Sequence, residues 1–133
     1  MPMAARHTMK TWLITGVSSG FGNEMTKQLL AAGDTVIGTV RNTKKVEDLI
    51  AKYKDTFDCQ ILDVTDTEKV HALVRTSFEK HGKIDVIVNN AGYGLFGAAE
   101  ELDEENINKI IATNLTAPIL IIHSSLPYLR RQG

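Results

Sequence analysis

A cluster of three glycines between a short apolar run and an amphipathic segment constrains the fold most strongly. The run TWLIT at 11–15 leads into TGVSSGFG at 15–22, after which apolar residues recur with helical period. Gly16 permits a tight exit from a strand, Gly20 lets the backbone approach a pyrophosphate, and Gly22 lets a helix pack closely on the strand. This order predicts a nucleotide-binding turn, and a purely structural turn of small residues is the alternative.

The turn also supplies donors for phosphate oxygens. N–H groups at the start of the following helix lack intrahelical partners, and the positive end of the helix dipole favours an anion. Two serine hydroxyls inside the turn can add further bonds. No Gly-Lys-Ser/Thr follows, so the turn is not that of an ATP-hydrolysing P-loop. We assign to the phosphate site Gly16, Ser18, Ser19, Gly20, Phe21 and Gly22.

The rest of the chain repeats this alternation of apolar run and amphipathic segment. Further runs lie at 35–40, 58–62 and 85–89, and none shows a clean alternation of polar and apolar residues. Strands of that kind are typical of a parallel sheet covered on both faces. Together with the helical segments they predict a single α/β domain of βαβ units. We expect residues 1–9 to be a leader outside this domain, which spans 10–133.

The helical segments differ in character. The third carries Thr65 and Glu68 at the spacing of a capping box. The last, at about 114–130, is apolar nearly all round and contains Pro118 and Pro127. Because proline removes a helical hydrogen bond, we expect this helix to be kinked. An apolar surface on every side predicts burial against another surface.

The amino-acid composition limits the kinds of partner that this chain can be expected to bind. Fifteen Lys and Arg face sixteen Asp and Glu, so no bulk positive charge attracts nucleic acid or an anionic membrane. The longest apolar run near the end, APILII at 117–122, is far shorter than the about 20 residues of a membrane helix. Cys59 has no second cysteine to pair with, and His71, His81 and His123 lack the spacing of metal ligands. We expect a soluble, cytoplasmic protein without a metal site, a membrane or a nucleic-acid partner.

Two motifs together resemble those of a known family. TGVSSGFG at 15–22 matches the TGxxxGxG pattern of the short-chain dehydrogenases/reductases, and NNAG at 89–92 matches their second hallmark in the correct order. The resemblance runs from about residue 10 to the last residue, and NNAGYGLFGAAEEL is similar to the branch that contains hydroxysteroid and retinol dehydrogenases. It implies a Rossmann-like doubly wound parallel sheet, here its first four strands in the order 3-2-1-4 with flanking helices.

The end of the second strand bears on the choice of cofactor. An acidic residue there would bond the ribose 2′-hydroxyl of NAD and repel a 2′-phosphate, but this chain reads GTVRNTKK. Arg41 and Asn42 would instead offer bonds to a 2′-phosphate, so we expect NADP(H) to be preferred over NAD(H). The alternative is that Arg41 is an ordinary solvated loop charge.

The resemblance also implies roles for residues after the third and fourth strands. It places Asp63 at the adenine amino group and Val64 against the ring edge, although Asp63 could equally be a turn residue leading into a helix. In NNAG, it implies that Asn89 steadies the central strand. Ala91 and Gly92 would then let the backbone approach the riboses of the cofactor.

One catalytic residue of the family has a counterpart here, and the others do not. The resemblance makes Asn114, in ATNLTAP, the asparagine that holds a water in a proton relay to the active-site lysine, and an exposed helical asparagine is the alternative. The family's serine and Tyr-x-x-x-Lys pair are absent, since Tyr53 and Tyr128 have no lysine four residues later and Tyr93 is followed by Gly97. We expect these 133 residues alone to be inactive.

Three functions are compatible with these observations. The first is the cofactor-binding half of an NADP(H)-dependent oxidoreductase, which transfers hydride between nicotinamide and a small-molecule carbonyl or alcohol. The second is a complete, non-catalytic NADP(H)-binding module or sensor, and the third is a scaffold for protein partners. A sheet of four strands would leave the fourth with an open edge and the last helix half uncovered. We therefore expect a homo-oligomer formed through the last helix.

Overall fold

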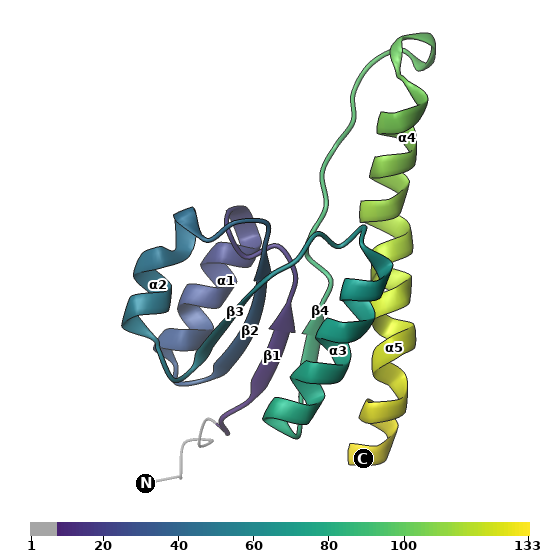
Figure 1. Ribbon diagram of the computed structural model, residues 1–133. Helices are drawn as coiled ribbons and strands as arrows, with labels where there is room; N and C mark the ends of the chain where they lie inside the picture. Colours follow the sequence, from purple (N-terminus) through teal and green to yellow (C-terminus); the bar gives the residue numbers. More distant parts are fainter. Residues whose placement is uncertain (1–7) are drawn as a thin grey trace, which may run out of the picture.

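The computed structural model describes residues 8–133, and Figure 1 shows one parallel sheet with helices on both faces. The strand order is β3-β2-β1-β4, which confirms the predicted Rossmann-like arrangement. The expected leader at 1–9 falls mostly outside the described residues. The strands are β1 (Thr11–Ile14), β2 (Thr35–Val40), β3 (Phe57–Ile61) and β4 (Val86–Val88).

Two apolar cores, one on each face, hold the helices to the sheet. On one face, Ile14 and Val36 pack with Leu30 of α1 and with Val46 of the short helix before α2. The opposite face packs the sheet against α3 and the end of the long helical run (Figure 1). Since both faces are buried, the strands need no polar alternation. The helices are α1 (Gly20–Ala31), η1 (Lys44–Val46), α2 (Glu47–Lys52), α3 (Thr67–His81), η2 (Ala99–Glu101), α4 (Glu104–Ile111), η3 (Ala112–Thr116) and α5 (Ala117–Gln132).

The last helix is longer than the sequence indicated. The chain stays helical from α4 through η3, a π-helical turn, into α5. Pro118 does not break this run because it occupies the first turn of α5, directly after the π-turn, where the regular α-helical hydrogen bonding is already interrupted. The expected start near Asn114 is therefore wrong: residues 114–130 belong to one continuous helical run that begins at Glu104 (Figure 1).

The length of this helical run also corrects the sequence-based estimate, which counted only the six apolar residues at 117–122. Glu104–Gln132 has 29 residues and a mean hydropathy of 1.4 in its most apolar window, which is enough to cross a membrane by length and composition alone. One such helix is weak evidence, since a core helix of a soluble protein passes the same test, but such core helices are mostly buried and only 22% of this window is. The absence of a membrane partner stays a prediction.

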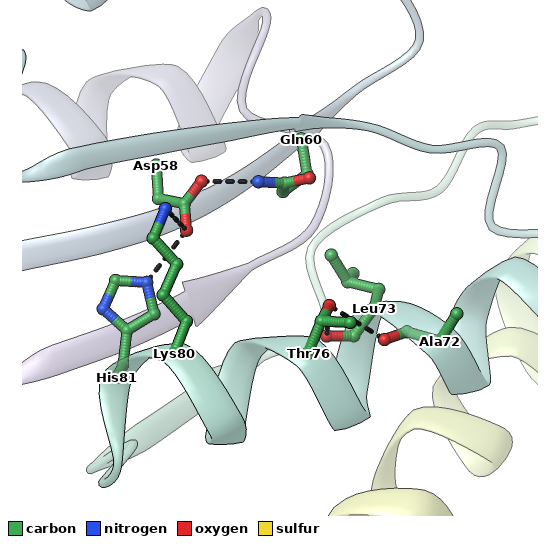
Figure 2. Close-up of polar contacts among 7 residues, drawn as sticks. All are labelled: Asp58, Gln60, Ala72, Leu73, Thr76, Lys80 and His81. Atoms are coloured by element: carbon green, nitrogen blue, oxygen red, sulfur yellow. Dashed lines mark hydrogen bonds and ion pairs between the residues drawn. The ribbon is translucent and has the colours of Figure 1, made fainter.

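Polar contacts fasten both ends of α3. At its start, the N-cap is Asp66, whose carboxylate accepts a bond from the N–H of Lys69, so the predicted capping box of Thr65 and Glu68 is wrong and the cap lies one residue later. At its end, the side chains of Lys80 and His81 meet Asp58 on the edge strand β3, with His81 Nε2 2.8 Å from the carboxylate (Figure 2).

Asp58 holds an ionised carboxylate in this contact. Its Oδ1 also accepts a bond from the amide of Gln60, and its side chain is only 12% exposed. Burial alone would raise the pKa of Asp58, but the bonds from these three side chains outweigh burial and hold the pKa below its ordinary value. The contact therefore stabilises the attachment of α3 to β3 at neutral pH.

Candidate functional site

The glycine turn lies at the carboxyl end of β1, against the turn that follows β4. Gly16 has a φ of 70° and Gly20 a φ of 60°, a region that residues with a side chain rarely adopt. A Cβ on Gly16 would lie 3.0 Å from the Cα of Ala91, so the two turns touch backbone to backbone. A Cβ on Gly20 would meet nothing within 4 Å, which leaves open space in front of that residue.

Asn90, which the sequence did not single out, braces the glycine turn. The Asn90 amide donates to the carbonyl oxygens of Thr15 at 3.1 Å and Gly16 at 2.9 Å. In return, the Thr15 hydroxyl accepts bonds from the N–H groups of Asn90 and Ala91. The oxygen of the Asn89 amide is instead buried without a hydrogen-bond partner among the described residues. The contacts that tie NNAG to the glycine turn therefore come from its second asparagine.

Gly22 is required for this bracing. A Cβ at Gly22 would collide with the amide nitrogen of Asn90 and with the carbonyl oxygen of Gly16. Gly22 is itself buried and does not line the neighbouring cavity. Its role in the structure is thus the close packing of α1 on the strand, as expected from the motif.

A cavity of about 340 Å³ opens in front of these turns, at the carboxyl edge of the sheet. Such a position at the edge of an open parallel sheet is where ligands bind in doubly wound folds. Predicted residues that line it are Gly16, Ser18, Ser19, Gly20, Phe21, Arg41, Asp63, Val64, Ala91 and Gly92. Lining residues that sequence analysis missed are Thr39, Val40, Leu62, Asn90, Tyr93, Lys109 and Thr113.

The start of α1 faces this cavity without a protein anion. Its N-cap, Ser19, makes no side-chain capping bond, and the first turn contains no acidic residue. The positive end of the helix is therefore not neutralised by the chain itself. Together with the serine hydroxyls of the turn, this arrangement fits the negative charge of a phosphate or pyrophosphate.

Asp63 contributes a fixed negative charge to the same cavity. Its Oδ1 accepts bonds from the hydroxyl of Thr65 at 2.7 Å and from the N–H of Thr65 at 2.9 Å. These two bonds hold the pKa of Asp63 below its ordinary value, against a smaller opposing effect of burial. The positive charges of Arg41 and Lys109 lower it further. Both bonds to Thr65 use Oδ1, so Oδ2 keeps its capacity to accept a bond from a ligand.

Two predicted residues have other partners in the structure. Asn42 does not line the cavity, and its side-chain oxygen accepts a bond from the N–H of Lys44 within its own loop. Asn114 lies in the π-turn, and its amide forms two bonds with the backbone of Tyr93, at 3.1 Å to the nitrogen and 2.7 Å to the oxygen. Asn114 therefore fastens the segment after β4 to the long helical run.

Among residues 8–133, the cysteine and the three histidines form no second site of this kind. Burial and, to a smaller extent, the charge of Asp58 raise the pKa of the Cys59 thiol, which disfavours a nucleophilic thiolate. His71 Nδ1 lies 2.7 Å from the hydroxyl of Ser124, a contact that joins α3 to α5. Within residues 8–133, no group of three or more His, Cys, Asp or Glu side chains could hold a metal ion.

Comparison with known proteins gives a consistent result. A family model described as short chain dehydrogenase matches residues 10–133. The chain is 37% identical over 124 residues to Oxidoreductase BOA17 of Botryotinia fuckeliana, covering 92% of this chain and 45% of that protein. The chain thus spans less than half the length of this relative.

Solved structures extend the likeness to three dimensions. A short-chain dehydrogenase from Streptomyces avermitilis superposes with a TM-score of 0.90 at 39% identity, over 96% of this chain and 47% of that one. A metagenomic short-chain oxidoreductase in complex with NADP gives 0.85 at 26% identity, over 92% and 57% of the two chains. A 3-ketoacyl-(acyl-carrier-protein) reductase from Brucella melitensis complexed with NADH gives 0.84 at 30% identity, over 93% and 52%.

Proposed function

Because the chain belongs to the short-chain dehydrogenase family, we propose that it is the cofactor-binding half of an NADP(H)-dependent oxidoreductase. One observation carries this proposal: the uncapped start of α1 and the glycine turn open onto a cavity that the NNAG turn also lines. This cavity fits the cofactor, since no side chain fills the space in front of Gly20 and no protein anion occupies the helix end.

Different residues of the cavity would bind different parts of the cofactor. The start of α1 and the hydroxyls of Ser18 and Ser19 would bind the pyrophosphate. Asp63 would accept a bond from the adenine amino group, and Ala91 and Gly92 would admit the riboses. When bound, a nicotinamide cofactor supplies the hydride-transfer chemistry by which a carbonyl and an alcohol are interconverted.

The preference for NADP(H) over NAD(H) rests on Arg41. This residue follows β2 directly and lines the cavity, and no acidic residue stands at the end of that strand to bond a ribose 2′-hydroxyl. A guanidinium binds a phosphate through paired, charge-assisted bonds. Among related structures, the metagenomic enzyme holds NADP and the Brucella enzyme holds NADH, so the family accommodates both.

Catalysis would require more than these residues provide. Asn114 holds the Tyr93 backbone beside the cavity through both polar atoms of its side chain, and its place in a proton relay is part of this proposal. No tyrosine of the chain has a lysine four residues later. We therefore expect the 133 residues to bind cofactor without oxidising an alcohol or reducing a carbonyl.

The proposed partner surface is the outer face of the long helical run. Four apolar side chains along it are about half exposed: Ile111, Leu115, Ile119 and Ile122. Contact with a second copy through this face would remove that apolar surface from water, which favours a homo-oligomer. A small-molecule carbonyl or alcohol as substrate and a cytoplasmic location complete the proposal.

The test is a titration of the chain with NADPH and NADH, followed by nicotinamide fluorescence. Trp12 is a poor reporter, since its indole N–H bonds to Asp34 at the amino end of the sheet, away from the cavity. We expect NADPH to bind roughly tenfold more tightly than NADH, and Arg41→Gln to remove this difference by weakening NADPH alone. Equal affinities that Arg41→Gln leaves unchanged would contradict the NADP(H) preference, and no binding of either nucleotide would contradict the proposed function.

A further inference from the structure

Lys109 lies at the cavity although it is far in sequence from every predicted cofactor residue. It belongs to the last turn of α4, and Thr113, four residues later on the same helical face, lines the cavity as well. The long helical run thus forms a wall opposite the glycine turn. No motif pointed to this lysine, because the fold alone brings α4 to the ends of β2 and β3.

The cavity contains three charged side chains, and their signs are informative. Two are cations, Arg41 and Lys109, and one is the carboxylate of Asp63, which leaves a net charge of +1. Both cations are close enough to lower the pKa of Asp63. Neither forms an ion pair within 4.0 Å of that carboxylate in the described part of the chain, so both keep donors available for an anion.

We propose that Lys109 is a second specificity residue for the cofactor, which favours the 2′-phosphate by offsetting the negative charge of Asp63. This inference rests on the proposed binding of NADP(H). Without Lys109, one cation and one carboxylate would leave this end of the cavity with no net charge. A 2′-phosphate would then gain the attraction of Arg41 but suffer the repulsion of Asp63.

The exposure of Lys109 fits such a role. Its side chain is solvent-exposed and makes no hydrogen bond or ion pair with another described residue. It can therefore turn towards a bound nucleotide without breaking a contact of the fold. Its action is mainly Coulombic and should weaken as salt concentration rises.

Two adenosine fragments test the inference without the nicotinamide. We would measure the binding of adenosine 2′,5′-bisphosphate and of adenosine 5′-diphosphate to the 133-residue chain by calorimetry. We expect Lys109→Gln to weaken the 2′-phosphorylated fragment roughly three- to tenfold and the other fragment less than about twofold, since a solvent-exposed charge acts weakly. Lys109→Arg should retain the wild-type preference.

A matched control removes the same charge elsewhere. Lys54 is exposed in the loop before β3, at the amino edge of the sheet, and Lys54→Gln should leave both affinities unchanged. An equal loss in Lys54→Gln would overturn the inference, because net charge and not position would then be responsible. So would unchanged affinities in Lys109→Gln when Arg41→Gln weakens the 2′-phosphorylated fragment. If the wild-type chain binds neither fragment, the proposed function itself fails and this inference falls with it.

Discussion

Helices α1 and α3 both start at the carboxyl edge of the sheet, but they start in opposite ways. The N-cap of α3 is Asp66, which bonds the N–H of Lys69, and Glu68 adds a second carboxylate to its first turn. The N-cap of α1 is Ser19, which makes no such bond, and no acid follows it. The chain neutralises the positive end of α3 and leaves that of α1 for a ligand.

The far ends of the two helices show the same difference. The last turn of α3 carries Lys80 and His81, which meet Asp58 on β3. The last turn of α1 has no basic residue. The end of α3 is thus tied to the sheet by charged side chains, whereas the end of α1 is closed by backbone bonds from Ala32 and Gly33. The first N–H groups of a helix can be satisfied by a side chain or by a ligand, and only α3 uses a side chain.

The contrast between the two helices is tested most directly by giving α1 an aspartate N-cap like that of α3. In Ser19→Asp, a carboxylate would bond the free N–H groups and neutralise the helix end, so the folded state should be unchanged or slightly more stable. The same carboxylate would repel the pyrophosphate, and we expect NADPH to bind roughly tenfold to a hundredfold more weakly. Fluorescence titration together with thermal melting measures both effects.

The control is the reverse change in α3. Asp66→Ala removes a capping bond of a helix whose start does not line the cavity, so it should cost about 1 kcal/mol of stability and leave NADPH affinity unchanged. If Ser19→Asp binds NADPH as tightly as the wild-type chain, the start of α1 is not the phosphate site.

A second prediction uses two glycines that both have a positive φ. Gly20 at the start of α1 and Gly82 at the end of α3 have φ values of 60° and 73°, and a Cβ at either would meet nothing within 4 Å. Alanine should therefore destabilise both variants, by about 1 kcal/mol or more, because residues with a side chain rarely adopt a positive φ. Only Gly20→Ala should also weaken NADPH, by roughly tenfold, because its methyl group would stand where backbone and pyrophosphate approach.

The two variants are judged by the difference between them. Lowered melting temperatures in both variants with a loss of affinity in Gly20→Ala alone would assign Gly20 to the ligand and Gly82 to the fold. A loss of affinity in Gly82→Ala as large as in Gly20→Ala would show that destabilisation alone weakens binding.

The sequence predicted the fold more completely than it predicted the site. Four apolar runs separated by helical segments were enough to place every strand within about two residues. The sequence could not show which of Asn89 and Asn90 contacts the glycine turn, because adjacent residues at a strand end point to opposite sides. Which side faces the glycine turn depends on the register of β4 with β1, in which Val88 pairs with Ile14.

Residues that reach the site from a distance were also beyond sequence analysis. Lys109 and Thr113 line the cavity because a continuous helix passes the sheet edge, and no local pattern encodes that path. Pro118 and the apolar run around it favoured a separate, kinked helix. The π-turn at 112–116 directly precedes that proline instead, and within it Asn114 bonds the Tyr93 backbone. Such contacts are tertiary and leave no periodic signal.

The smallest expected effect concerns the far end of α3 and its dependence on pH. The pKa of Asp58 is lowered in the folded state, so its contribution to stability is present above the unfolded value of about 3.9 and is lost as pH falls through the folded pKa. Asp58→Asn should cost about 0.5–1 kcal/mol at pH 7, since the Lys80 side chain is 65% exposed and solvent screens its charge. Urea denaturation at pH 7 and pH 3 should show this difference shrinking at the lower pH, with NADPH affinity at pH 7 unchanged. A difference that stays constant between the two pH values would mean that the Asp58 contacts act through shape and not charge, and the contrast between the two helices would then be confined to their starts.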